Sequence, residues 1–328
     1  MDSLQKIAER IKAARKVAIT THMRPDGDAF GCALALSRAL DSLGIENGVF
    51  VESDIPANLA FIDGIDKVQK RMRQDFDLVI AVDCSDEQRL GALSDEFLIA
   101  RRKKIDTVNV DHHVSNTRFA KYNYVRECAA NCMNVATLIK YLGASFDKKT
   151  ADYLLIGLLT DSGNFSHDDV NEEAMLLAAA LLRAGGDIRG LQYELFKKQS
   201  PARAALHAAT MSGIRYFFDG RFALIVVTQA TMEKCGADAS ATEGFVDFPL
   251  NVEGVEVAAS LLEVKKRQYK ISLRSKFYAD VNKIAAHYGG GGHVRAAGCT
   301  ITADSILSAE MTIVLAVEGK LSELSLNN

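Results

Sequence analysis

The sequence predicts an α/β protein with a parallel-sheet N-terminal domain and a smaller α/β domain at the C-terminus. Short runs rich in Val and Ile alternate with helical segments up to about residue 190, which is the pattern of βαβ units around a parallel sheet. After about residue 207 the strand-like runs follow one another more closely, which indicates a second domain of different organisation. At 328 residues the chain is also longer than one average domain.

The N-terminal domain is expected to span residues 1–190. Its strands are short and apolar, as in parallel sheets buried on both faces, and we expect them over 16–21, 48–51, 76–82 and 104–110. Its helices carry apolar residues at helical spacing, and we expect them over 3–15, 29–43, 130–142, 148–159 and 172–184. Gly44 and Gly185 lie where two of these helices end, as glycine often does.

Residues 191–206 are expected to form a linking helix that is broken near Pro201, because proline interrupts a helix interior. The C-terminal domain then spans residues 207–328. We expect its strands over 214–218, 222–227, 255–264 and 268–274, with the last two forming a β-hairpin. Helices are expected over 280–288 and 306–321, with a glycine loop over 289–292 after the first of them.

Composition and charge exclude several classes of protein. The net charge of −3 provides no global basic field for long nucleic-acid duplexes or anionic membranes. No apolar stretch is long enough for a membrane span, and no signal peptide is recognisable, so we expect no membrane partner. The six cysteines are scattered, which is typical of isolated thiols in a reducing cytoplasm. The oligomeric state is left open, with a homodimer as one candidate assembly.

Histidine and aspartate recur where apolar segments end. The run 17–21 is followed by His22, Asp26 and Asp28, the run 79–82 by Asp83, the run 107–110 by Asp111-His112-His113, and the run 153–160 by Asp161. The carboxyl ends of parallel strands meet at one edge of a sheet, where ligands bind. Histidine and carboxylate side chains without a cysteine set suit a divalent ion such as manganese or magnesium. The pattern therefore predicts a two-metal hydrolytic site.

A plainer interpretation exists for each of these segments taken alone. Asp26-Gly27-Asp28 also fits an ordinary turn with Asp28 capping the following helix, and a lone aspartate such as Asp83 often serves as a turn residue. Two adjacent histidines after Asp111 have no evident packing role. The recurrence of the pattern favours the metal site over a series of separate turns.

A glycine-rich segment, residues 289–298, predicts an anion-binding site in the C-terminal domain. Gly291 and Gly292 allow a close approach of the backbone, so that main-chain amides can surround an anion. His293 and Arg295 follow directly and can bind a phosphate group, with Arg274 from the preceding strand as a further cation. The alternative is a flexible loop with solvated charges.

These motifs resemble those of a known family. His22-x-x-x-Asp26-Gly27-Asp28, Val82-Asp83, Asp111-His112-His113 and Thr160-Asp161-Ser162-Gly163 resemble, in order, the four motifs of the DHH phosphoesterase superfamily. The segment 289–298 resembles the glycine-rich signature of the C-terminal substrate-binding domain associated with it. The resemblance covers essentially the whole chain. Its two-domain layout is similar to that of the nano-RNases and 3′-phosphoadenosine 5′-phosphate phosphatases of the NrnA type.

The resemblance implies a role for each motif residue. His22, Asp26 and Asp83 would hold a first metal ion, and Asp28, Asp83, His112 and Asp161 a second, with Asp83 bridging the two. It also implies manganese as the preferred ion and His113 as the residue that contacts the scissile phosphate or assists the leaving group.

The implied function is hydrolysis of short oligoribonucleotides to mononucleotides, with 3′-phosphoadenosine 5′-phosphate as a second substrate. The partners expected are therefore short RNA oligonucleotides or small nucleotides. Two alternatives stay open at this point. One is a phosphodiesterase acting on cyclic or linear dinucleotides with the same site, and the other is a nucleotide-binding sensor without catalysis.

Overall fold

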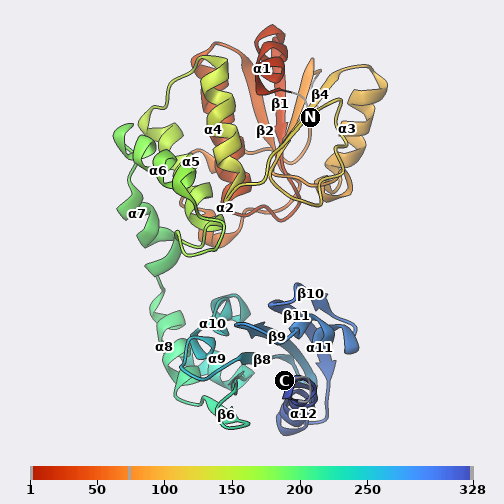
Figure 1. Cartoon of the computed structure of the whole chain (residues 1–328), viewed down its shortest axis with the longest axis vertical. Coiled ribbons are helices and arrows are strands. Elements are labelled where there is room, and N and C mark those ends of the chain that lie inside the picture. Colours follow the sequence, from red (N-terminus) through yellow and green to blue (C-terminus); the bar gives the residue numbers. More distant parts are fainter. Residues whose placement is uncertain (1–2, 73–74, 326–328) are drawn as a thin grey trace. The chain divides into compact units, whose positions relative to one another are not determined.

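A parallel sheet of five strands forms the centre of the N-terminal unit in the computed structural model, which describes residues 3–72 and 75–325 (Figure 1). The strand order is β2-β1-β3-β4-β5, and every neighbouring pair in it is parallel. The strands are β1 (Lys16–Thr20), β2 (Glu46–Phe50), β3 (Leu78–Val82), β4 (Asp106–Asp111) and β5 (Tyr122–Val125). The predicted α/β class with a parallel N-terminal sheet is confirmed.

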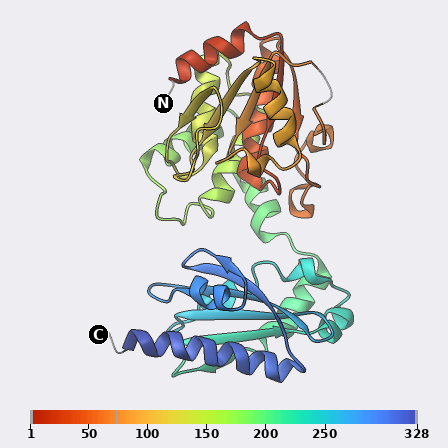
Figure 2. The ribbon, with the colours of Figure 1, turned by 90° about the vertical axis from the view of Figure 1, so that its right-hand side faces the viewer.

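Helices cover both faces of this sheet. Strands such as β3 are therefore buried at every position. One face packs against α1, α2 and α4, with α5 and α6 behind them, and the other packs against α3 (Figures 1 and 2). The helices of the unit are α1 (Leu4–Ala13), α2 (Gly27–Ser42), α3 (Leu93–Arg102), α4 (Asn131–Leu142), α5 (Lys148–Asp161), α6 (Glu172–Arg183) and α7 (Ile188–Gln192).

The chain divides into two units after Lys198. The segment before this point ends in a π-helical turn, Tyr193–Lys197, and Pro201 begins α8 (Pro201–Met211) at its first position, where proline fits a helix. The break expected in the linking helix thus lies just before the proline. None of the helices in the described part of the chain combines the length and apolar character that a membrane span needs.

A mixed sheet of six strands, in the order β10-β11-β9-β8-β7-β6, forms the centre of the C-terminal unit within the described residues. β8 and β9 form the predicted hairpin. The strands are β6 (Arg215–Phe217), β7 (Phe222–Val227), β8 (Val257–Lys265), β9 (Gln268–Ser275), β10 (Gly291–Gly292) and β11 (Ala296–Thr302). The remaining helices are α9 (Gln229–Cys235), α10 (Asp247–Leu250), α11 (Val281–His287) and α12 (Ile306–Ser325).

The two faces of the C-terminal sheet differ. Tyr269, Ile271 and Leu273 of β9 are buried against α11 and α12, which lie along one face (Figure 2). The alternate residues of β9 point to the other face, where α8 and α9 pack over β7 and β8 and α10 contacts β9. β9 and β11 therefore present a partly open polar surface on that side.

The structure corrects several sequence-based expectations. The helices α3, α9 and α10 and the strand β11 were not predicted. β5 was not predicted, because its four residues are only half-buried and do not form an apolar run. Part of the expected glycine loop over 289–292 is strand, since Gly291 and Gly292 pair with Gly298 and Ala297. The other predicted helices and strands are present with boundaries shifted by a few residues.

Candidate metal centre

Three neighbouring strands of the N-terminal sheet end at one edge, and each is followed by a residue that can bind a metal ion. His22 lies two residues after β1, Asp83 directly follows β3, and His112 directly follows β4. The strands are parallel and adjacent, so their carboxyl ends bring these three side chains together, as the sequence predicts.

Asp83 lies at the centre of the group. Its backbone adopts the left-handed conformation, with φ of 52°, and its amide donates to the carbonyl of Val110 on β4. Its carboxylate uses a different oxygen toward each histidine: Oδ2 is 3.5 Å from Nε2 of His22, and Oδ1 is 3.4 Å from Nε2 of His112. Oδ1 is buried without a hydrogen-bond partner among the described residues. A buried carboxylate oxygen of this kind fits a bound cation, which would supply the missing partner.

Two helices supply the remaining carboxylates. Asp26 caps α2 by accepting hydrogen bonds from the amides of Asp28 and Ala29, while Asp28 lies fully buried in the first turn of that helix. Asp161 ends α5, and its Oδ2 is 3.4 Å from Nε2 of His112. Asp161 thus follows a helix rather than a strand, and it reaches the site because α5 packs against α2.

The structure brings together all six residues that the sequence suggests as metal ligands. Their ligand atoms include two groups in which all atoms lie within 4.8 Å of one another: His22, Asp26 and Asp83, and Asp28, His112 and Asp161. A third group of this kind among the described residues joins Asp83 and His112 to His113. The two histidines are also oriented for binding. Nδ1 of His22 is 2.9 Å from the carbonyl of Met23, and Nδ1 of His112 is 2.9 Å from that of Cys128, which leaves each Nε2 directed at the carboxylates.

The concentration of buried charge shifts the pKa values in the site. Burial, together with the charge of Asp83, raises the pKa of Asp28 to about 7. Burial, with the charges of Asp28 and Asp83, raises the pKa of Asp161 to about 10. Burial opposes protonation of His112, but the adjacent carboxylates of Asp83 and Asp28 outweigh this and raise its pKa to about 10. Mutual repulsion of this kind is relieved by divalent cations.

His113 is held beside the six residues by a chain of polar side chains. Its Nδ1 is 2.8 Å from Oδ1 of the buried Asp111, and 3.8 Å from Oδ1 of Asp83. The side-chain nitrogen Nδ2 of Asn116 donates to Oδ2 of Asp111 at 2.6 Å and to Oδ1 of Asn109 at 2.8 Å. Asp111 therefore orients His113 and belongs to neither group of candidate ligands.

The sequence does not reveal the hydrogen-bond donors that hold the carboxylate of Asp28 in place. The main-chain amides of Asn131 and Cys132, at the start of α4, donate to its two carboxylate oxygens, and the Cys32 thiol lies 3.4 Å from Oδ1. Backbone amides carry no side-chain signal, so no residue type could have indicated them. Asn116 did carry a signal, as a polar residue three positions after His113 in a segment without apolar periodicity.

The residues suggested for anion binding gather at one end of the C-terminal sheet. Arg274 on β9 pairs with Ala296 on β11, beside the β10–β11 turn that carries His293 and Arg295. A side chain at Gly292, with φ of 150°, would collide with the carbonyl of Ala296, so glycine is required for the turn. The guanidinium of Arg295 donates to the carbonyls of Phe277 and Ala279 and thereby fixes the adjacent loop.

The raised pKa values in the site predict how the stability of the metal-free protein depends on pH. Raised folded-state pKa values at Asp28, Asp161 and His112 mean that the metal-free protein binds protons more tightly than the unfolded chain, so its stability falls as the pH rises between 5 and 8. The lowered pKa of Asp83 acts in the opposite direction, but only below its ordinary value of 3.8. We expect the Tm in a chelator to be about 5 °C lower at pH 8 than at pH 5, since 1 kcal/mol moves Tm by about 2–4 °C at this size.

Calorimetry with and without Mn²⁺ measures this effect. The ion competes with protons, so it should raise Tm more at pH 8 than at pH 5. The control is Asp28→Asn, which removes one raised carboxyl and should reduce the pH dependence of the metal-free protein. A metal-free Tm that is constant or rises over this range would contradict the prediction.

Comparisons with known proteins find relatives that cover nearly the whole chain. The family described as "DHH family, N-terminal domain" matches residues 16–158, and the "DHHA1 domain" matches residues 223–320. The chain is 30% identical to the "Bifunctional oligoribonuclease and PAP phosphatase NrnA" of Thermus thermophilus, with 98% of this chain and 95% of that protein covered. It is 26% identical to the "Probable bifunctional oligoribonuclease and PAP phosphatase NrnA" of Streptococcus mutans, with 91% and 93% covered.

A solved structure shows the same likeness. The chain superimposes on an exopolyphosphatase-related protein from Bacteroides fragilis with a TM-score of 0.85 and 26% identity. The match covers 96% of this chain and 95% of that one. The similarity therefore extends over both units.

Proposed function

The chain belongs to the DHH family, and from this membership we propose that it is a phosphoesterase that hydrolyses short oligoribonucleotides to mononucleotides. We propose 3′-phosphoadenosine 5′-phosphate as a second substrate, since the relatives from Thermus thermophilus and Streptococcus mutans carry names that join both activities. The observation that carries the proposal is the carboxylate of Asp83, which directs one oxygen to each of two ligand groups.

Two divalent cations, which we propose to be Mn²⁺, would be held by His22, Asp26 and Asp83 and by Asp28, Asp83, His112 and Asp161. When bound, they supply Lewis acidity and positive charge for phosphoryl transfer to water. The donor set of imidazole nitrogens and carboxylate oxygens suits such an ion.

Residues outside the two groups of candidate ligands would bind and orient the substrate. His113, fixed by Asp111, would contact the scissile phosphate and transfer a proton to the leaving oxygen. In the C-terminal unit, Arg274, His293, Arg295 and the amides of Gly291 and Gly292 would bind a second anionic group of the same substrate. The proposed domain bounds stay 1–190 and 207–328, with the linking segment 191–206 between them.

The test is product analysis of the purified protein with Mn²⁺ and four substrates: a diribonucleotide, a longer single-stranded RNA, 3′-phosphoadenosine 5′-phosphate and a cyclic dinucleotide. We expect mononucleotides from the diribonucleotide, and turnover that stops in a chelator. Preference for the cyclic compound would replace the proposal with a cyclic-dinucleotide phosphodiesterase. Binding without turnover of any substrate would indicate a nucleotide sensor.

We also propose a cytoplasmic location, because all six cysteines are free thiols, as in proteins of a reducing compartment. The candidate homodimer is tested by light scattering of the purified chain. A mass of one chain at working concentrations would contradict it.

A further inference from the structure

The open face of the C-terminal sheet contains a polar cavity that the proposed roles do not use. It has a volume of about 320 Å³, at the lower end of the range of ligand pockets, about 300–1,000 Å³. β8 and β9 form one wall, and the segment around Ala239–Thr242, a 3₁₀-helix, forms the other. Arg274, which we propose as an anion-binding residue, lies at one end of it.

The residues of β9 that line the cavity alternate along the strand. Lys270, Ser272 and Arg274 share one face, and Ser272 pairs across the sheet with Ser260 of β8, which also lines the cavity. Lys270 and Arg274 are four positions apart, or about 13 Å along the strand. The order along this face is therefore cation, pair of hydroxyls, cation.

Several of these polar groups have no partner among the described residues. Within residues 3–72 and 75–325, the structure shows no hydrogen bond from the hydroxyl of Ser260 or Ser272 and no ion pair for the exposed Lys270. Arg274, in contrast, lies 3.4 Å from a carboxylate oxygen of Asp247. Free donors that line a cavity are available to a ligand.

The cavity also contains an acidic residue. Glu243 lines the wall opposite β9, so the site carries both signs of charge rather than a uniform positive field. A free phosphate would bind less favourably here than a ligand that also presents neutral hydroxyl groups. A strand of RNA does so, because each ribose carries a 2′-hydroxyl between two phosphates.

We propose that this cavity binds an internal nucleotide of an RNA strand, with Ser260 and Ser272 at the ribose and Lys270 at the phosphate beyond it. The proposal rests on the proposed function and extends it. Arg274 lies beside the β10–β11 turn, to which we assign one anionic group of the substrate, and Lys270 lies four positions away on β9. Lys270 therefore contributes only when the strand extends beyond that group. Lys270 is thus assigned as a residue that sets the preferred length of the substrate.

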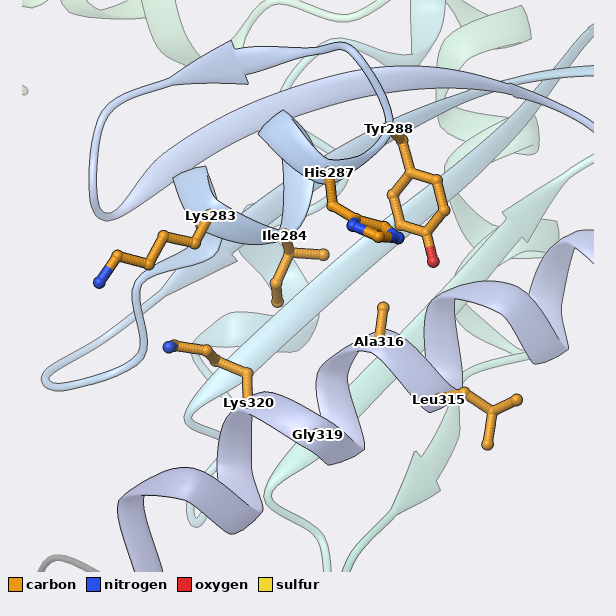
Figure 3. Close-up of a pocket in the computed structure, with 8 residues that line it drawn as sticks. All are labelled: Lys283, Ile284, His287, Tyr288, Leu315, Ala316, Gly319 and Lys320. Atoms are coloured by element: carbon orange, nitrogen blue, oxygen red, sulfur yellow. The ribbon is translucent and has the colours of Figure 1, made fainter.

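A second cavity provides a matched control. It has a volume of about 450 Å³, lies on the opposite face of the sheet between α11 and α12, and is bordered by Lys283 and His287 above the backbone of α12 (Figure 3). Leu315, Ala316 and Gly319 give its α12 side an apolar character. Lys283→Ala removes the same charge as Lys270→Ala, from the same unit, without touching the polar cavity.

The experiment measures binding of the full chain in a chelator, where no turnover takes place, by titration calorimetry with a diribonucleotide and a pentaribonucleotide. Lys270→Ala should weaken binding of the pentaribonucleotide about tenfold, the loss expected for one charge-assisted hydrogen bond, and leave the diribonucleotide unchanged. The slope of log Kd against log salt should fall by about 0.7 for the longer strand, as for the loss of one phosphate contact. Lys283→Ala should change neither ligand.

The proposal would be overturned if Lys270→Ala lost equal affinity for both oligonucleotides or lost none for either. The same loss of affinity in Lys283→Ala would also overturn it. Ser272→Ala tests the ribose contact, since it should weaken binding of the pentaribonucleotide but not of its deoxy counterpart; equal weakening of both would remove that contact. The proposed function fails separately, if the wild-type protein with Mn²⁺ cleaves no short RNA.

Discussion

Replacing Asp83 with Asn is expected to lower the rate of hydrolysis by more than about a thousandfold while the protein stays folded. Loss of one preorganised electrostatic group at an active site costs about 10²–10³ in rate, and Asp83 directs its two oxygens to two ligand groups. Asparagine has the shape of aspartate, so the packing around the buried side chain is preserved. Initial rates with a diribonucleotide and Mn²⁺, together with circular dichroism, measure both parts of the prediction.

The same substitution should remove the stabilisation that Mn²⁺ gives to the wild-type protein. In the absence of metal, the variant is expected to be less stable than the wild type, because the lowered pKa of Asp83 reflects a favourable interaction of its charge with His22 and His112. Asp95→Asn, in the first turn of α3, is the control and should leave activity unchanged. Substantial hydrolysis by the Asp83 variant would disprove the assignment of the metal centre.

The second large effect is expected from Gly157→Ala, in the middle of α5. A Cβ atom at this position would lie 2.3 Å from Oδ1 of Asp28 and 3.1 Å from Cβ of Cys132, so α2 and α4 would have to move. Overpacking of a core costs about 1–3 kcal/mol, which here corresponds to a Tm lower by about 5 °C. Because Asp28 is displaced directly, the affinity for Mn²⁺ should fall as well, and calorimetry measures both quantities.

Gly319→Ala is the control for this variant. Gly319 also lies inside a helix, α12, but a Cβ atom there would meet no other atom within 4 Å. Alanine favours a helix by about 1 kcal/mol relative to glycine, so this variant should be as stable as the wild type or more so. A Gly157 variant that behaves in the same way would show that α2 and α5 can separate without cost.

The sequence predicts much of the candidate metal centre because the candidate ligands follow the ends of apolar runs. Parallel strands place those ends at one edge, so the sequence alone groups His22, Asp83 and His112. Asp161 was placed by its motif, and the helix expected over residues 148–159 is confirmed as α5, which ends at Asp161.

The features that the sequence does not reveal depend on contacts between distant segments. β5 is recognised only by its pairing with β4, since its own residues are half-buried and irregular in pattern. The amides of Asn131 and Cys132 hold Asp28 through backbone atoms that every residue possesses. The polar cavity combines β8 and β9 with residues 239–246, and its lining residues have no common motif.

The division of the chain after Lys198 has a consequence for biosynthesis. All six candidate ligands lie between His22 and Asp161, and the hydrophobic core that supports them is built from residues that precede the division. Domains generally fold as units, with the N-terminal one first, while the ribosome is still extending the chain. The nascent polypeptide therefore carries both groups of candidate ligands before the C-terminal unit, which we propose to bind RNA, has been translated. Under the proposed function, metal loading and the acquisition of substrate specificity would be separate events in the life of one molecule.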